Sequence, residues 1–250
     1  MFLILNLLCI SVKAQESTYN SLFKLTSEVS TSATNANHYN ERGLIKEREG
    51  DLEGALEFYS IAVNMASKVP AYLFNKGITL QKLEKHIEAI EIFLELTEID
   101  KTDFEAFIAL GVSYGMTGQY TEAVKALDIA ERLRPSFKRI YYQRGTFLNL
   151  MGDYPRAQKD FEIAVKREPS FAKAWYNRGI NYKDMEKFRR AINDFNKAIE
   201  LDPNHSESYL ARGVAYMNIN RKKEGSEDLK RAADMGVEEA KMLYEKYCRD

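Results

Sequence analysis

Side chains that could bind a metal ion or a nucleotide are scattered along this sequence. The three histidines, His38, His86 and His205, stand far apart, and none has a cysteine or a second histidine nearby. A zinc site usually takes its ligands from short spacings, so the sequence predicts no metal site. The two glycine-rich phosphate-binding motifs, G-x-x-x-x-G-K-[ST] and G-x-G-x-x-G, are absent. We therefore expect no cofactor.

Two stretches have the form of a catalytic or a modification motif. The stretch SLFK at 21–24 matches S-x-x-K, but the companion motifs of that enzyme class are missing. The stretch NHS at 204–206 has the form of a glycosylation acceptor, and within LDPNHSES we interpret it as a turn. Adjacent carboxylates such as Glu238 and Glu239 fall on the exposed face of an expected helix. The sequence therefore predicts a protein that is not an enzyme and has no catalytic residues.

The elements that would position any site follow from an internal repeat. Six glycines recur at one constant interval: Gly43, Gly77, Gly111, Gly145, Gly179 and Gly213. Most are followed by an alanine and then by a large apolar residue at fixed distances, as Ala191 and Phe195 follow Gly179. Each repeat carries two stretches whose apolar residues are spaced three and four apart, which predicts two amphipathic helices. In the fifth repeat we expect them at 173–185 and 189–201.

The segments between these helices carry turn residues. Three glycines suit the left-handed conformation that ends a helix: Gly50, Gly118 and Gly152. Three prolines suit the turns between repeats, because proline cannot continue a helix: Pro135, Pro169 and Pro203.

This pattern resembles the tetratricopeptide repeat, a 34-residue unit with a W-x₂-L-G-x₂-Y…A-x₃-F…P signature. The best match is Trp175, Gly179, Tyr182, Ala191, Phe195, Ala198 and Pro203. The chain departs from the signature where Arg or Lys replaces Leu before the glycine, and where Ser67 and Lys101 replace the closing proline. The resemblance implies an all-α fold, a right-handed superhelical α-solenoid of helix-turn-helix repeats. Six repeats would occupy 36–235, starting near residues 36, 70, 104, 138, 172 and 206.

The two ends of the chain lie outside the repeats. Residues 236–250 predict a C-terminal capping helix, which would cover the apolar end of the array. Residues 15–35 are rich in Ser, Thr and Asn and predict a polar leader or linker.

The segment 1–14 predicts a signal peptide. The apolar run 2–12 is shorter than the roughly 20 residues of a membrane span, and Val12-Lys13-Ala14 resembles a small-residue cleavage site. The alternatives are a buried N-terminal element and an uncleaved anchor. Cleavage would leave no membrane span, and Cys248 as the only cysteine. We therefore expect an exported protein of the periplasm or cell envelope, or a cytoplasmic one if the signal interpretation is wrong.

The balance of basic and acidic residues indicates which class of partner the protein binds. The chain has 36 Lys and Arg against 37 Asp and Glu, a formal net charge of −1. Nucleic-acid-binding proteins usually carry a marked basic excess, so no nucleic-acid partner is expected.

The first helices of tetratricopeptide repeats line a concave groove that commonly holds an extended peptide or a partner's helix. The resemblance implies which positions face that groove, and repeats four and five place two tyrosines, amides and three cations there. Tyrosine and arginine are typical interface anchors, and amides can satisfy a peptide backbone. The predicted peptide-binding residues are Asn75, Arg139, Tyr142, Gln143, Thr146, Asn149, Lys173, Tyr176, Asn177, Ile180 and Lys183. The alternative is that these side chains solvate an inner face or support the adjacent helix.

These patterns together predict a non-enzymatic protein–protein interaction module or scaffold. Its expected partner is a protein or peptide that binds as an extended segment or as a helix, and repeats four and five favour an extended segment that is acidic or carries a carboxylate. The alternatives are a structural protein that associates with itself and, third, a carbohydrate-binding accessory or enzyme subunit. The third would need a polar pocket with converging titratable groups, of which the sequence gives no sign.

Overall fold

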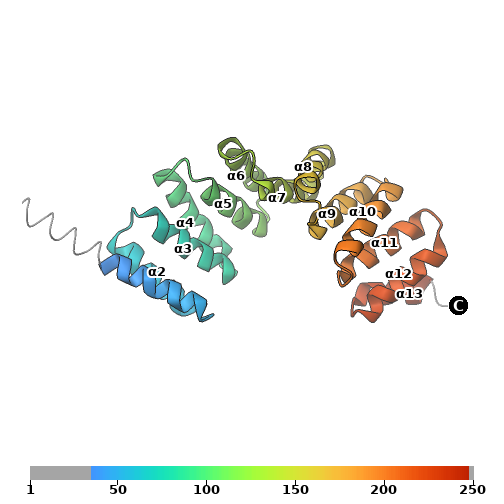
Figure 1. Ribbon diagram of the computed structural model, residues 1–250, viewed down its shortest axis with the longest axis horizontal. Coiled ribbons are helices and arrows are strands. Elements are labelled where there is room, and N and C mark those ends of the chain that lie inside the picture. The colour runs from blue at the N-terminus through green and yellow to red at the C-terminus, as the bar shows by residue number, and fades with distance from the viewer. Residues whose placement is uncertain (1–34, 248–250) are drawn as a thin grey trace, which may run out of the picture. The chain divides into compact units, whose positions relative to one another are not determined.

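The computed structural model of the protein describes residues 35–247, and this range contains helices and turns but no strand. A helix at residues 35–48 comes first. The helices that follow are α2 (Leu52–Met65), α3 (Pro70–Lys82), α4 (His86–Ile99), α5 (Phe104–Met116), α6 (Tyr120–Leu133), α7 (Lys138–Leu150), α8 (Tyr154–Arg167), α9 (Ala172–Asp184), α10 (Phe188–Leu201), α11 (Ser206–Asn218), α12 (Lys222–Asp234) and α13 (Glu238–Tyr247) (Figure 1).

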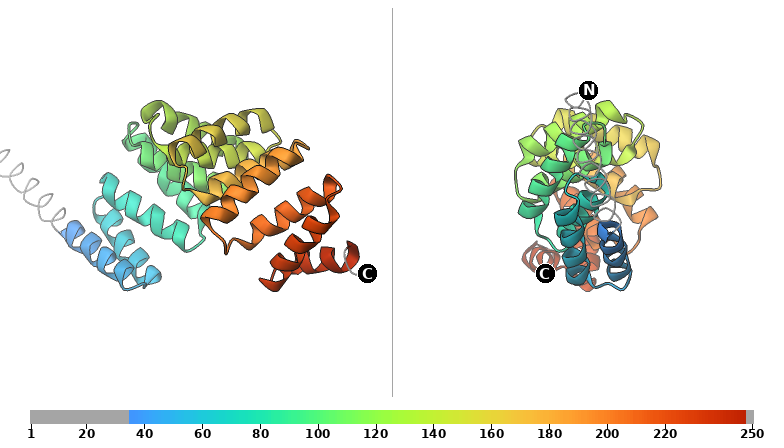
Figure 2. Two further views of the ribbon diagram at one scale, coloured as in Figure 1. Left: turned by 45° about the vertical axis from the view of Figure 1, so that its right-hand side comes forward. Right: turned by 90° about the vertical axis from the view of Figure 1, so that its left-hand side faces the viewer.

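The chain divides into two compact units, unit 1 (Met1–Lys101) and unit 2 (Thr102–Asp250). In unit 1, α3 packs against α4, and in unit 2 the pairs α5–α6, α7–α8, α9–α10 and α11–α12 follow one another (Figure 2). Helix α13 packs against α12. The predicted all-α solenoid of helix pairs with a C-terminal capping helix is therefore confirmed.

Some sequence predictions concern parts of the chain that the structure does not describe. The predicted signal peptide at 1–14 and Cys248 lie outside the described residues, and so does nearly all of the polar leader at 15–35. Within the described range, none of the helices combines the length and the apolar character needed to cross a bilayer.

Each repeat glycine lies where the first helix of a pair contacts a large side chain of the second helix. A Cβ atom on Gly179 would lie 2.6 Å from Cε1 of Phe195, and one on Gly77 would lie 2.6 Å from Cε1 of Phe93. The partners of the six glycines, in chain order, are Tyr59, Phe93, Leu127, Phe161, Phe195 and Leu229. All six partner side chains are fully buried. The contact with a buried large side chain offsets the roughly 1 kcal/mol that glycine costs inside a helix.

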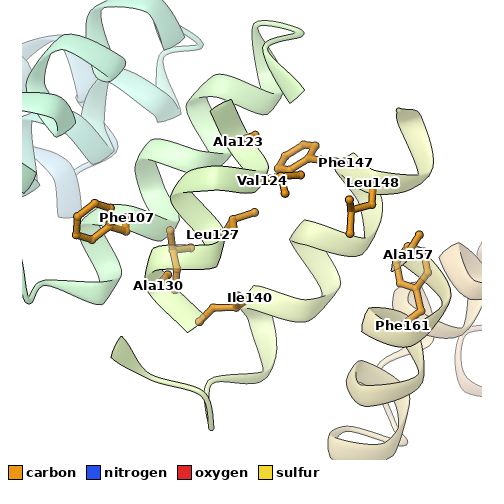
Figure 3. Close-up of a cluster of buried hydrophobic side chains, with 11 residues drawn as sticks. Phe107, Ala123, Val124, Leu127, Ala130, Ile140, Phe147, Leu148, Ala157 and Phe161 are labelled. Carbon is orange, nitrogen blue, oxygen red and sulfur yellow. The ribbon is translucent and has the colours of Figure 1, made fainter. Parts of the chain in front are cut away.

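The core of unit 2 is shared between repeats. Leu127 and Phe161 are each the glycine partner of their own repeat, and both belong to one buried cluster that spans α5 to α8. Figure 3 shows Phe147 of α7 beside Val124 of α6, which belong to different repeats. A single helix pair could not bury its apolar face, and stacking neighbours completes the core.

The turn between the two helices of each repeat contains one residue with positive φ. Three of these are the predicted glycines, Gly50, Gly118 and Gly152, with φ of 82°, 78° and 79°. The other three repeats have Glu84, Glu186 and Asn220 at this place, with φ of 59°, 58° and 61°. The turn therefore keeps one backbone shape in all six repeats, even where the residue tolerates it less well than glycine.

Ion pairs with buried aspartates account for three of the four arginines that precede a repeat glycine, and the fourth, Arg42, lies over the Phe58 ring instead. The arginine before the glycine binds an aspartate of the second helix through two nitrogen–oxygen contacts of 2.7–2.8 Å: Arg144 with Asp160, Arg178 with Asp194, and Arg212 with Asp228. The three aspartates are buried. The third repeat has the apolar pair Leu110 and Ala126 at these two positions, also buried. In repeats three to six the helix pair is thus closed at these two positions either by an ion pair or by apolar contact.

Two of these arginines also reach the preceding repeat. Nη1 of Arg144 lies 2.7 Å from Oδ1 of Asp128 on α6, and Nη1 of Arg212 donates to Oδ1 of Asn196 on α10 at 2.7 Å. Each arginine therefore links three helices: its own, the second helix of its repeat and the second helix of the repeat before.

The apolar pair of the third repeat provides a test of the ion pair in the fifth. We expect Asp194→Ala to destabilise the protein by about 3–5 kcal/mol, because it leaves the Arg178 guanidinium buried without its carboxylate. The double variant Arg178→Leu/Asp194→Ala copies Leu110 and Ala126 and should lose less stability than Asp194→Ala alone. Urea unfolding followed by circular dichroism measures both. A double variant at least as unstable as the single one would contradict this account.

Candidate functional site

The first helices of unit 2 contact one another across successive repeats, α5 with α7, α7 with α9, and α9 with α11. This contact brings together the predicted residues of α7 and α9, which we call the inner surface: Arg139, Tyr142, Gln143, Thr146, Asn149, Lys173, Tyr176, Asn177, Ile180 and Lys183. Asn75 belongs to unit 1, where its Nδ2 donates to Oδ1 of Asn40 at 2.9 Å.

Several polar residues of the inner surface bond to one another. Nδ2 of Asn177 donates to Oγ1 of Thr146 at 3.1 Å, and that hydroxyl donates to the Tyr142 carbonyl oxygen at 2.9 Å. Nδ2 of Asn149 lies 3.2 Å from both Oδ1 of Asn181 and Oδ2 of Asp184. Thr146, Asn149 and Asn177 therefore join α7 to α9, as the alternative interpretation of a supporting role expects.

The two tyrosines of the inner surface are half-buried against the turns that follow. The Tyr142 ring meets Phe171 edge-on at a centroid distance of 4.9 Å, and the Tyr176 ring meets His205 in the same way at 4.8 Å. Burial raises the pKa of both phenols. Both tyrosines are therefore neutral, and they present rigid aromatic surface with one polar edge.

The ring partners Phe171 and His205 were not among the predicted site residues. They occupy equivalent places in successive repeats, as the residues that precede α9 and α11, and Phe137 stands at the same place before α7. Phe137 likewise meets Phe104 edge-on at 5.3 Å. The recurrence of these rings at the repeat interval was the signal in the sequence that could have revealed them.

A cavity of about 400 Å³ opens beside Tyr142. It is lined by Lys138, Arg139, Tyr142, Gln143, Ala164, Glu168 and Phe171. Nζ of Lys138 lies 2.7 Å from Oε1 of Glu168, so this cation is already paired.

Two groups of this cavity are unused. In the described part of the chain, Arg139 is exposed and forms no ion pair, and Oε1 of Gln143 is buried without a hydrogen-bond donor. A buried acceptor without a partner costs roughly 1–3 kcal/mol. The cavity thus offers a guanidinium for an anion, and a turn of the Gln143 amide toward it would add a carbonyl oxygen for an N–H group.

The remaining residues of the inner surface differ in their surroundings. Lys173 is exposed and stands in α9 at the place that Arg139 takes in α7, one repeat earlier. Nζ of Lys183 lies 3.4 Å from Oδ1 of Asp184, and Ile180 packs against the apolar cluster of α9 to α11. The structure therefore leaves Arg139 and Lys173 exposed and outside any ion pair of the described residues, although Lys173 helps to lower the pKa of the Glu207 carboxyl. Oε1 of Gln143 has no donor.

A second cavity, of about 320 Å³, lies at the end of unit 2. Its lining is mostly apolar and comes from α11, α12 and α13: Val214, Met217, Asn218, Leu229, Leu243 and Tyr247. Over residues 35–247, no cluster of His, Cys, Asp or Glu side chains has the arrangement of a metal site.

Family models described as the tetratricopeptide repeat match four stretches of the chain, residues 70–103, 151–181, 172–205 and 195–225. Among curated proteins, none matches the sequence.

Several solved structures have this arrangement of helices. Three of them match this chain over most of their own length. MamA from Desulfovibrio magneticus RS-1 is 23% identical with a TM-score of 0.63, and the match covers 66% of this chain and 94% of that one. A tetratricopeptide repeat protein from Parabacteroides merdae is 22% identical with a TM-score of 0.66, over 86% and 85% of the two chains. YrrB, described as a TPR protein with an unusual peptide-binding site, is 20% identical with a TM-score of 0.59, over 71% and 92%. At these identities the likeness shows the fold.

Proposed function

The chain belongs to the tetratricopeptide repeat family, and we propose that it is a non-enzymatic module that binds an extended, acidic segment of another protein on the inner surface of α7 and α9. The observation that carries this proposal is the pair of unused groups in the cavity beside Tyr142. Arg139 lacks a carboxylate there, and Oε1 of Gln143 lacks a donor.

The chemistry of a peptide segment supplies what this cavity lacks. An Asp or Glu side chain can pair with the Arg139 guanidinium through two parallel hydrogen bonds. A backbone N–H group can donate to Oε1 of Gln143 once that amide turns toward the cavity. The rings of Tyr142 and Phe171 form an apolar wall beside both groups. Binding would therefore remove an existing cost as well as add a charge-assisted contact.

The repeat geometry extends this preference to a second acidic residue. Lys173 is the counterpart of Arg139 one repeat further on, and α7 contacts α9 directly. Helices in contact lie about 10 Å apart, which is about three residues of an extended chain at ~3.3 Å each. The preferred segment would therefore carry two carboxylates about three residues apart.

Reversing the two exposed cations tests this surface without disturbing the core. We expect Arg139→Glu/Lys173→Glu to fold normally and to bind captured partner segments at least about tenfold more weakly, because both charge contacts become repulsive. Partners captured from a cell-envelope extract by the wild type would be identified, and their segments titrated as synthetic peptides by fluorescence anisotropy.

The matched control is Lys125→Glu/Arg132→Glu, which reverses two exposed cations on α6, outside the inner surface. It should bind as the wild type does. Equal affinities for the wild type and the α7–α9 variant would show that the inner surface is not the binding site.

We also propose that the protein is exported and meets its partner in the periplasm or cell envelope. The support for this is the apolar run 2–12 followed by Val12-Lys13-Ala14, together with a chain that retains only Cys248 after cleavage.

Mass spectrometry of the protein purified from its own host tests the export proposal. The expected mature chain begins at Gln15. A chain that retains its N-terminal sequence from Met1 would contradict cleavage after Ala14.

A further inference from the structure

Charge is segregated along the second helices of the repeats. Helices α2 and α4 of unit 1 contain no Lys or Arg. Their exposed carboxylates, which we call the acidic face, are Glu53, Glu57, Glu88, Glu91, Glu95 and Glu98. Within the described chain, Glu98 pairs with Lys101 and the other five form no ion pair.

Helices α8 and α10 of unit 2 have the opposite character. Their basic face consists of Arg156, Lys159, Lys166, Arg189, Arg190 and Lys197. Of the four carboxylates in these two helices, Asp160 and Asp194 are buried in the ion pairs with Arg144 and Arg178. Glu162 and Glu200 are the other two, and Glu200 pairs with Lys197. Arg156 pairs with Asp153 and Asp128, outside these two helices. Lys159, Lys166, Arg189 and Arg190 form no ion pair within the described residues.

Helix stability alone does not account for this distribution. Glu53 and Glu57, like Glu91 and Glu95, are like charges four residues apart, which destabilise a helix by about 0.2–0.5 kcal/mol per pair. The chain has nearly equal numbers of both signs and could have interspersed them. A separation that costs stability indicates a surface meant for a charged partner.

The acidic face also contains exposed apolar side chains. Ile87 and Leu94 of α4 are 69% and 43% exposed, and they alternate with Glu91 and Glu98 at spacings of four, three and four residues. One side of α4 therefore presents apolar residues between carboxylates, the composition of an interface with a dry centre and a charged rim.

We infer that the acidic face of α2 and α4 binds the basic face of α8 and α10 of a second copy of this chain. One chain carries both faces. Each copy can therefore bind one neighbour through its acidic face and a second neighbour through its basic face. Such a head-to-tail contact builds open chains unless its rotation closes a ring. This contact uses the second helices of the repeats and leaves the inner surface of α7 and α9 free.

The dimensions of the faces set the strength of the contact. A 14-residue helix is about 21 Å long, and two neighbouring second helices present a face of about 400 Å². Two such faces bury about 800 Å², below the roughly 1,200 Å² of a stable interface. The association is therefore weak and depends on salt, because exposed charges are screened.

Sedimentation velocity of the full chain at increasing concentration, in about 0.02 M and about 0.5 M salt, tests this inference. The average mass should rise with concentration in low salt and return to that of a single chain in high salt. A wild type that stays monomeric in low salt would overturn the inference. The same holds if the protein stays monomeric and binds vesicles that contain anionic lipid, because the basic face would then serve a membrane.

Charge exchange identifies the two faces. Glu91→Lys/Glu95→Lys and Lys159→Glu/Arg189→Glu should each abolish self-association, and an equimolar mixture of the two variants should restore it. Glu238→Lys/Glu239→Lys on α13 is the matched control and should associate as the wild type does. The inference is overturned if the mixture stays monomeric, or if only the basic-face variant loses association, since the bound surface would then not be α2 and α4.

Discussion

The contact between the glycine of each first helix and the buried side chain of the second helix is the constraint on which the structure depends. At Gly179 there is no room for a Cβ atom beside Phe195, so the two helices could not keep this contact with a larger residue there. This contact fixes which side of the first helix faces its partner, and therefore which residues lie on the inner surface. Because it recurs once in every repeat, Arg139 and Lys173 stand at equivalent places in α7 and α9.

The buried arginine–aspartate pairs act beside this contact and extend it to the neighbouring repeat. Arg144 binds Asp160 within its own repeat and Asp128 in the one before, so one side chain links α6, α7 and α8. The third repeat is closed by Leu110 and Ala126 instead, which shows that the ion pair is not required for closure. Its contribution is to fix one arrangement of three helices, since a misplaced helix would leave a buried charge unpaired.

The constant interval between the glycines and the apolar spacing within each repeat were sufficient to predict the helix pairs, because both depend on residue types alone. Spacing could not show which polar groups of the inner surface are already bonded. Thr146 and Asn177 were predicted as binding residues, and the structure shows them joined across α7 and α9. Gln143 belongs to the same predicted set, yet its Oε1 is left without a donor. Such differences depend on side-chain conformation and on the distance between helices, which a repeat pattern does not contain.

Selection from a random peptide library displayed on phage tests the central claim most directly, because it assumes no partner in advance. On the full-length protein, we expect selected peptides to share two acidic residues about three positions apart, the spacing of Arg139 and Lys173 across neighbouring helices. The same selection on Arg139→Glu/Lys173→Glu should lose this motif. Selected peptides without acidic residues, or the same acidic peptides on both proteins, would contradict the proposal that α7 and α9 bind an acidic segment.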